Sequence, residues 1–211
     1  MLPSMDEARK VREFWFGKPP LSPEQLHRRM QIWFGNGITP EQQQHLDESI
    51  RSRYERLMAQ AAAGELASWA DGPRRRLSLI LLLDQFPRNI YRGTARAYAY
   101  DDQALELALT GMQSGADAAL DPVERIFFYM PLQHAEAREA QDESVAAYRR
   151  LLREVPESLK DVFQDSLNHA ERHRDVIERF GRFPHRNQTV GRPTTPQEVV
   201  YLRESGEAVS G

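Results

Sequence analysis

The stretch TPEQQQHLDESIRSRYERLMAQAAAG, residues 39–64, carries a complete helix signature. The Thr39 hydroxyl can accept a hydrogen bond from a free amide of the first turn, and Pro40 suits the first helical position. Gly64 can take the left-handed conformation that ends many helices. Between these limits, apolar residues follow one helical face: Leu46, Ile50, Tyr54, Leu57, Met58 and Ala61. The stretch therefore predicts one long helix.

The same type of helix start recurs along the chain. It is found at Ser22-Pro23-Glu24-Gln25, Asp121-Pro122-Val123-Glu124 and Thr195-Pro196-Gln197-Glu198, and without proline at Ser4-Met5-Asp6-Glu7. Periodicity and stop residues predict further helices at about 73–85, 101–110 ending at Gly111, 122–134, 139–155 ending before Pro156, and 157–180 ending at Gly181.

Short connections between successive helices predict an all-α fold of antiparallel helical hairpins, packed as a bundle or a short solenoid. TARAYAY, residues 94–100, alternates like a strand, but without a partner strand we expect an extended loop there. Trp15, Trp33, Trp69 and the IFFYM run at 126–130 are expected in the core.

Length and composition narrow the class of protein. A chain of 211 residues fits one domain, which we place at 1–203, and the Gly- and Ser-containing end at 204–211 is expected to fray. A net charge of −3 argues against a general nucleic-acid binder, since phosphate neutralisation needs a basic surface. Between Gly181 and Arg192 there are nevertheless three arginines and no acid, enough to hold one small anion.

Other classes of protein are disfavoured by what the sequence lacks. It contains no cysteine, which excludes disulfides, thiolate metal sites and cysteine nucleophiles. The charged start MLPSMDEARK does not fit a signal peptide, and no apolar run approaches the ~18 residues of a membrane helix, so we expect a cytoplasmic protein without a membrane partner. No GxxxxGK[ST], GxGxxG or GxSxG motif occurs.

Two polar segments follow apolar helices and could carry function. DQFPRN, residues 84–89, adds an acid, amides and an arginine to an apolar helix. RFGRFPHRN, residues 179–187, concentrates hydrogen-bond donors at the end of another helix. A buried Asp84 needs a partner, which Arg88, Arg92 or Arg186 could supply, because unpaired buried polar groups cost about 1–3 kcal/mol. We expect the two segments to face each other across the core.

This polar set has two interpretations. One is a structural network that fixes helix ends. The other is a pocket in which arginines hold a carboxylate or phosphate while His173 or His185 handles a proton.

A helical histidine pair suggests a third possibility, a metal site. His169 and His173 are four residues apart, the spacing at which two imidazoles can share one metal ion. His134 or Glu136 could supply a third ligand. The pair lacks the glutamate placement of HExxH, and hydrogen bonds could equally satisfy both rings.

With these residues in view, the chain resembles the bacterial family called domain of unknown function 924. The segments that carry the resemblance are VREFWFG (11–17), LDQFPRNIYRGTARAYAYD (83–101), ALDPVERIFFYMPLQHAE (119–136), HRDVIERFGRFPHRN (173–187) and GRPTTPQEVVYL (191–202).

The resemblance implies an all-helical, tetratricopeptide-like fold and no established activity. The family's signature residues correspond to Asp84, Gln85, Pro87, Arg88, Asn89, His134, Glu136, His173, Arg182, Pro184, His185, Arg186 and Asn187. In the QHAE segment, residues 133–136, Ala135 stands where we expect related chains often to carry serine. This difference weakens any role for a hydroxyl group at that position.

Three functions follow as hypotheses. In the first, the segments around Asp84, His134 and Arg182 converge on a pocket for a small anionic ligand or an acidic peptide terminus. Arg88, Arg182 and Arg186 would hold the anion, Asn89 and Asn187 would orient it, and His134, His173 or His185 would donate protons. The alternatives are a metal-assisted hydrolase using His169, His173 and Glu136, and a protein-interaction scaffold. No cofactor is predicted, and the oligomeric state is left open.

Overall fold

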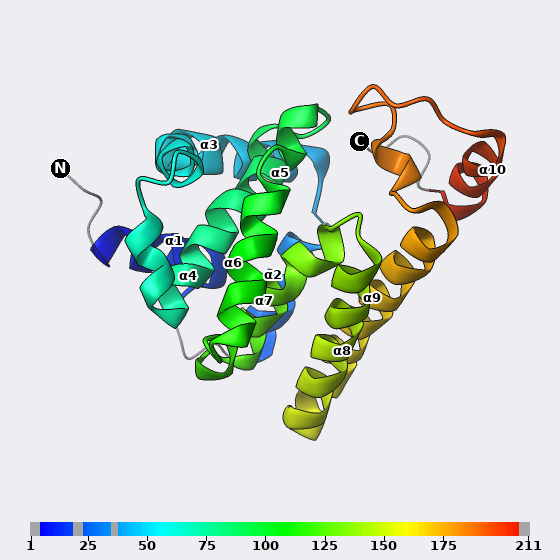
Figure 1. Ribbon diagram of the computed structural model, residues 1–211. Coiled ribbons are helices and arrows are strands. Elements are labelled where there is room, and N and C mark those ends of the chain that lie inside the picture. Colours follow the sequence, from blue (N-terminus) through cyan, green and yellow to red (C-terminus); the bar gives the residue numbers. More distant parts are fainter. Residues whose placement is uncertain (1–4, 19–22, 35–37, 207–211) are drawn as a thin grey trace.

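A computed structural model describes residues 5–18, 23–34 and 38–206 (Figure 1). Its α-helices are α1 (Met5–Phe16), α2 (Pro23–Trp33), α3 (Pro40–Ala62), α4 (Pro73–Ile80), α5 (Phe86–Ile90), α6 (Asp101–Gln113), α7 (Pro122–His134), α8 (Arg138–Glu154), α9 (Lys160–Phe180) and α10 (Pro196–Ser205). Leu81–Gln85 is a π-helical turn, and five short 3₁₀ turns lie at Ala67–Asp71, Ala95–Tyr98, Asp117–Ala119, Glu157–Leu159 and Pro184–Arg186. The described residues contain no β-strand, so the all-α prediction is confirmed.

Helix α7 lies at the centre of the packing. Residues 124–133 are all buried, and α7 contacts α4, α6, α8 and α9. In Figure 1, α1 to α7 form one group of helices, while α8 and α9 run as a hairpin that leads to α10 at the far end. The hairpin is strongly amphipathic in sequence, with its buried residues on the faces that meet each other and α7. Consequently α7 joins the two groups of helices.

The predicted caps are found where the structure describes them. Thr39, Asp121 and Thr195 each form a capping box with the side chain three residues later, and Gly64 and Gly181 have positive φ angles of 77° and 69° just after α3 and α9. Ser4 and Ser22 lie outside the described residues. At the other end, α10 continues to Ser205, and residues 207–211 lie outside the described ranges.

The sequence prediction was wrong at Gly111, which does not end α6. The helix continues to Gln113, and Gly111 is buried within it. A Cβ atom there would lie 2.5 Å from Phe128 Cζ and 2.7 Å from Arg76 Cδ. The glycine therefore permits α6 to approach α7 closely, a role that local sequence does not distinguish from a helix stop.

The prediction was also wrong for 94–100, where the chain forms a 3₁₀ turn at Ala95–Tyr98 in place of an extended loop. Ala97 is buried in this turn, and the Arg96 guanidinium lies 3.7 Å from the centroid of the Tyr91 ring. The guanidinium groups of Arg88 and Arg186 both lie over the ring of Tyr98. These tertiary cation–π contacts favour the compact turn.

The C-terminal helix is held by one buried carboxylate. Glu198, with its side chain 3% exposed, accepts hydrogen bonds from Arg182 at 2.6 and 2.9 Å, from Asn187 at 3.3 Å and from the Thr195 amide at 2.7 Å. The hydrogen bond from Arg182 is the main reason that the pKa of Glu198 falls to about 2. Its charge therefore attaches α10 to the loop that follows α9.

Replacing Gly111 by alanine is expected to lower the free energy of unfolding by about 1–3 kcal/mol, because the added methyl group overlaps Phe128. Alanine normally stabilises a helix interior by up to about 1 kcal/mol relative to glycine. Urea unfolding measures the change, and a stabilised Gly111→Ala variant would contradict the close approach of α6 and α7.

Glu198→Gln is expected to cost about 1.5–3 kcal/mol at pH 7, the usual contribution of hydrogen bonds to a charged group. The pKa of Glu198 is depressed in the folded state, so the carboxylate stabilises the fold above its ordinary pKa of 4.5 and this stabilisation is lost as pH falls toward 2. The difference between wild type and variant should shrink over that range. Urea unfolding at several pH values tests this, and a pH-independent difference would refute it.

Candidate functional site

The whole DQFPRN segment lies within a helical path, whereas the sequence predicted that this helix ends at about residue 85. The helical path begun in α4 continues through the π turn at Leu81–Gln85 and α5 to Ile90. The Phe86 amide donates to the Leu81 carbonyl five residues earlier, the π pattern. Pro87 lacks an N–H and would crowd a regular helix, so the wider turn before it lets the helical path continue. The side chains of Arg88 and Asn89 also bond back to the carbonyls of Asp84 and Gln85, at 2.7 and 2.9 Å.

Asp84 is fully buried, and its carboxylate is ion-paired and hydrogen-bonded to neighbouring side chains. Its Oδ1 lies 2.7 Å from His134 Nδ1 and 3.1 Å from the Arg88 guanidinium, and Gln85 donates to its Oδ2. Burial acts to raise the pKa of Asp84, but the charge of Arg88 and the contact with His134 outweigh burial, so this pKa lies well below its ordinary value. Asp84 is therefore an ionised carboxylate in the core.

His134, the last residue of α7, is oriented by this carboxylate. Because a carboxylate only accepts, His134 Nδ1 carries the proton and Nε2 carries the lone pair when the ring is neutral. Burial and the charge of Arg88 lower the pKa of His134 below 6.5, although Asp84 opposes this. The ring is therefore neutral at pH 7 and presents Nε2 as a hydrogen-bond acceptor or base.

Asp101 connects the two polar segments, as shown by its contacts with both. Arg88 binds it through two hydrogen bonds of 2.8 Å, and Arg186 approaches its Oδ2 at 3.4 Å. Arg186 also donates to the His134 carbonyl at 3.0 Å, and its guanidinium lies 4.5 and 4.6 Å from the ring centroids of Tyr98 and Phe183. In this way DQFPRN meets the loop after α9 through Asp101 and His134.

A cleft of about 350 Å³, which we call the central cleft, brings together many of the predicted residues. Its polar lining comprises two arginines, three histidines and four amides: Arg88, Arg92, His134, His169, His173, Gln43, Gln85, Asn89 and Gln133. Among the described residues that line it there is no carboxylate. Asp47, which bonds to Arg92, lies outside the lining, as do Asp84 and Asp101.

Apolar side chains form the rest of the wall, and three of them are aromatic. Trp15, Trp33 and Phe34 line the central cleft, and the Trp33 ring contacts both Trp15 and Phe127. Trp15, Trp69 and residues 126–130 are buried, as predicted for the core. Trp33 is only partly buried, so the prediction of a core role was incomplete for this residue: it lies at the boundary between core and cleft.

His169 and His173 both direct Nδ1 to a backbone carbonyl one turn earlier, at 2.8 Å in each case. Burial lowers the pKa of His173 to about 4, so that ring too is neutral at pH 7. The described residues contain no group of three His, Cys, Asp or Glu side chains that could hold a metal ion. Glu136, considered as a third ligand, instead bonds to Arg192 and to the Phe183 amide.

Four predicted residues lie apart from the central cleft. Arg182 and Asn187 bond to Glu198, Glu136 bonds to Arg192, and His185 lines a different groove beside α10. Arg186 likewise does not line the central cleft but reaches it indirectly through Asp101 and His134. The set proposed from sequence is thus divided between the cleft and the contacts that fix the C-terminal segment.

Sequence reasoning missed several residues of the site. Asp101 begins α6, where an acid is expected simply because it favours a helix N-terminus. Gln43 lies among other polar residues at the start of α3, and Gln133 precedes His134 at the end of α7, so neither is distinguished by the sequence. Arg92 was considered only as a partner for Asp84. Only the packing of α3 against α5, and of α7 against the π turn that precedes α5, shows their common location.

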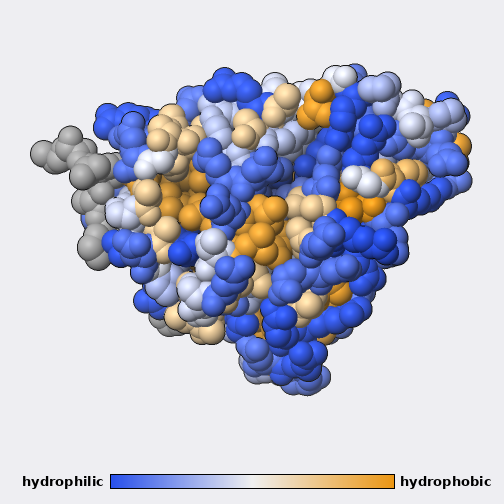
Figure 2. Space-filling model, in the orientation of Figure 1, coloured by the Kyte–Doolittle hydropathy of each residue, from blue (hydrophilic) through white to orange (hydrophobic). Residues whose placement is uncertain are grey.

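Figure 2 shows a mainly hydrophilic face with apolar patches toward its middle, and within the described ranges no helix is both long and apolar enough to cross a membrane. No curated protein matches the chain. A solved structure described as "Structure of Protein of Unknown Function ATU0120 from Agrobacterium tumefaciens" is 38% identical, with a TM-score of 0.69 over 87% of this chain and 99% of that one. The family of bacterial proteins of unknown function DUF924 matches residues 11–206. The chain therefore belongs to the DUF924 family.

Proposed function

We propose that the central cleft binds a small molecule that combines an anionic group with a hydroxyl or N–H donor. The anionic group binds Arg88 and Arg92, and the donor bonds to Nε2 of His134. The observation that carries this proposal is the pair formed by fully buried Asp84 and His134 at a cleft that also presents two arginines. A pocket that holds perturbed titratable groups is the usual place for a ligand.

The charges support an anionic group. Asp47 and Asp101 bond to the arginines from outside the lining and so orient each guanidinium. A guanidinium has five N–H donors. Arg88 contacts two carboxylates, Asp84 and Asp101, and Arg92 bonds to Asp47 and Asn89, so each arginine still has N–H groups for a ligand. Binding then depends on directed hydrogen bonds more than on net charge, because the carboxylates already balance the arginines.

The neutral histidines and the aromatic wall support the rest of the ligand. Neutral imidazoles accept hydrogen bonds, and Asp84 fixes which nitrogen of His134 does so. If the bound donor is also the reacting group, His134 is placed to act as its general base. Trp15, Trp33 and Phe34 can cover an apolar part of the ligand, and the volume of about 350 Å³ suits a small metabolite.

Arg92→Gln is expected to weaken ligand binding about two- to fivefold, because Arg92 is half exposed and its ion pairs are screened by water. A panel of small hydroxy acids and amino acids, with inorganic phosphate, would be screened by thermal shift, and the strongest binder measured by calorimetry. Arg149→Gln is the matched control: Arg149 has the same 50% side-chain exposure and an ion pair to Glu171, but it does not line the cleft.

Equal losses in the two variants would contradict binding in the central cleft. If no compound of the panel shifts the wild-type protein while Arg186→Ala prevents folding, the polar set is a structural network and the proposed function is wrong.

The pH dependence of binding should reveal His134. Because burial and the charge of Arg88 lower its pKa, affinity should be unchanged in neutral and alkaline solution and fall only in acid solution, where protonation removes the Nε2 acceptor. His173, whose pKa is about 4, also lines the cleft, and Asp84 and Arg88 keep their charges throughout. His134→Asn keeps an N–H donor for Asp84 and lacks the titrating ring. Calorimetry from pH 5 to 8 should show the acid loss in wild type only; a loss of the same size in the variant would assign it to another group.

A further inference from the structure

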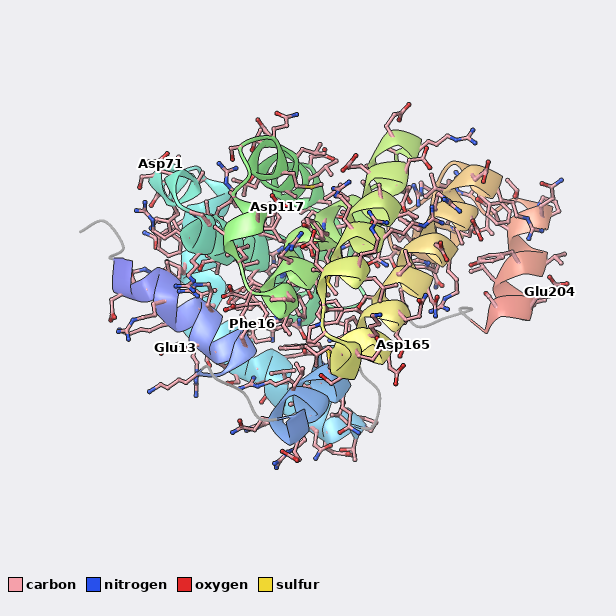
Figure 3. All side chains as sticks on the ribbon, turned by 90° about the horizontal axis from the view of Figure 1, so that it is seen from below. Glu13, Phe16, Asp71, Asp117, Asp165 and Glu204 are labelled. Atoms are coloured by element: carbon pink, nitrogen blue, oxygen red, sulfur yellow. The ribbon has the colours of Figure 1, made fainter. Side chains whose placement is uncertain are left out.

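A second groove lies between α9 and the C-terminal segment, separate from the central cleft except at its edge. Its volume is about 560 Å³, and His169 and His173 are the two residues that line both spaces. Figure 3 shows side chains of α9 and α10 extending toward each other across this region. The groove is not needed for the binding proposed above.

The groove carries two cations that no described acid neutralises. Arg172 and Arg179 are exposed residues of α9 and line the groove, and neither forms an ion pair with any residue of the described ranges. Arg179 instead lies over the rings of Phe180 and Tyr201, with its guanidinium carbon 4.7 and 5.8 Å from their centroids. Both positive charges are therefore available to a ligand.

The acids nearest to them along α9 are already paired. Glu171 bonds to Arg149 and Glu178 to Arg138, both on α8, and Asp175, the one carboxylate of the lining, lies 3.5 Å from Arg174. Figure 3 places Glu204 on the side of α10 away from α9. Among the described residues, the lining therefore carries two arginines and one carboxylate, in a chain whose net charge is −3.

The spacing of the two arginines limits what they can hold together. They are seven residues apart, which is two helical turns, so they share one face of α9 about 10 Å apart along its axis. Asp175 and Val176 both lie between them along the helix, and Asp175 is paired with Arg174. Val176, Phe180, Phe183 and Tyr201 form the apolar part of the lining. A single small anion can contact one arginine at a time, whereas the pair, with apolar side chains in the groove between its members, fits a longer molecule.

We propose that this groove binds an elongated dianion, a molecule with a carboxylate or phosphate at each end of an apolar body. Arg172 and Arg179 each bind one end, and the valine and the aromatic rings contact the middle. The proposal rests on the groove alone and holds whether or not the central cleft binds a ligand.

The test uses the diacid azelate and its matched monoacid nonanoate, which share the apolar chain and differ in one carboxylate. Binding is followed by NMR titration of the ¹⁵N-labelled protein, with the amides of α9 and α10 as reporters. We expect azelate to bind about two- to fivefold more tightly than nonanoate, since an exposed ion pair contributes an effect of that size. Succinate, which is too short to reach both arginines, should bind no better than nonanoate.

Arg172→Gln and Arg179→Gln should each remove the advantage of azelate over nonanoate. Both residues are exposed, so the variants should fold, which circular dichroism checks. Arg153→Gln is the matched control, because Arg153 is also an exposed arginine without an ion pair in the described structure but lies at the end of α8, outside the groove.

Four outcomes would overturn the proposal. The first three are equal affinity for azelate and nonanoate, a loss of the same size in Arg153→Gln, and no concentration-dependent shift with azelate. The fourth is a loss of azelate affinity in Arg92→Gln but not in the two groove variants, which would place the diacid in the central cleft; since azelate lacks a donor for His134, that result would leave the earlier proposal to its own test.

Discussion

The ionised carboxylate of Asp84 in the core is the constraint on which the surrounding structure depends. A buried charge is costly unless it is paired and hydrogen-bonded, and Arg88, His134 and Gln85 provide these contacts. Since Arg88 comes from α5 and His134 from α7, compensation of one charge joins two helices. Asp101 then joins Arg88 to Arg186, which brings the loop after α9 to the same place. One buried acid thereby relates three distant parts of the chain.

The same contacts fix the polar side chains of the central cleft to which we assign ligand binding. Asp84 selects the tautomer of His134, and Asp101 and Asp47 orient the arginines without lining the cleft themselves. Carboxylates placed behind donors in this way hold them in position before a ligand arrives, which lowers the entropic cost of binding. The π turn contributes as well, because it lets Asp84, Arg88 and Asn89 follow one helical path despite Pro87. In the function we propose, stability and ligand binding would therefore depend on the same residues.

Helix positions could be predicted largely from sequence, and the errors have a common physical origin. The capping boxes at Thr39, Asp121 and Thr195 and the glycine stop at Gly181 act through neighbours in sequence, so local patterns reveal them. Gly111 and the turn at Ala95–Tyr98 were mispredicted because contacts with distant residues decide their conformation: Phe128 for the first, Arg186 for the second. The helical hairpins follow from the pattern, while a tetratricopeptide-like arrangement and a single domain stay predictions.

By itself, the sequence determined which polar and charged side chains need a hydrogen-bond or ion-pair partner in the folded protein. An acid, arginines and histidines placed among apolar helical residues require partners, because unpaired polar groups are costly in a core. Arg88 lies one turn from Asp84 on the same helical path, so its spacing already made it a candidate partner. Only the tertiary structure decided the distant partners: His134 meets Asp84, Arg182 binds Glu198, and Arg192 binds Glu136. It also decided which donors face an open cleft. Pairing between distant residues depends on where their helices pack. Residue type and spacing along one helix contain no information on which other helix lies beside it.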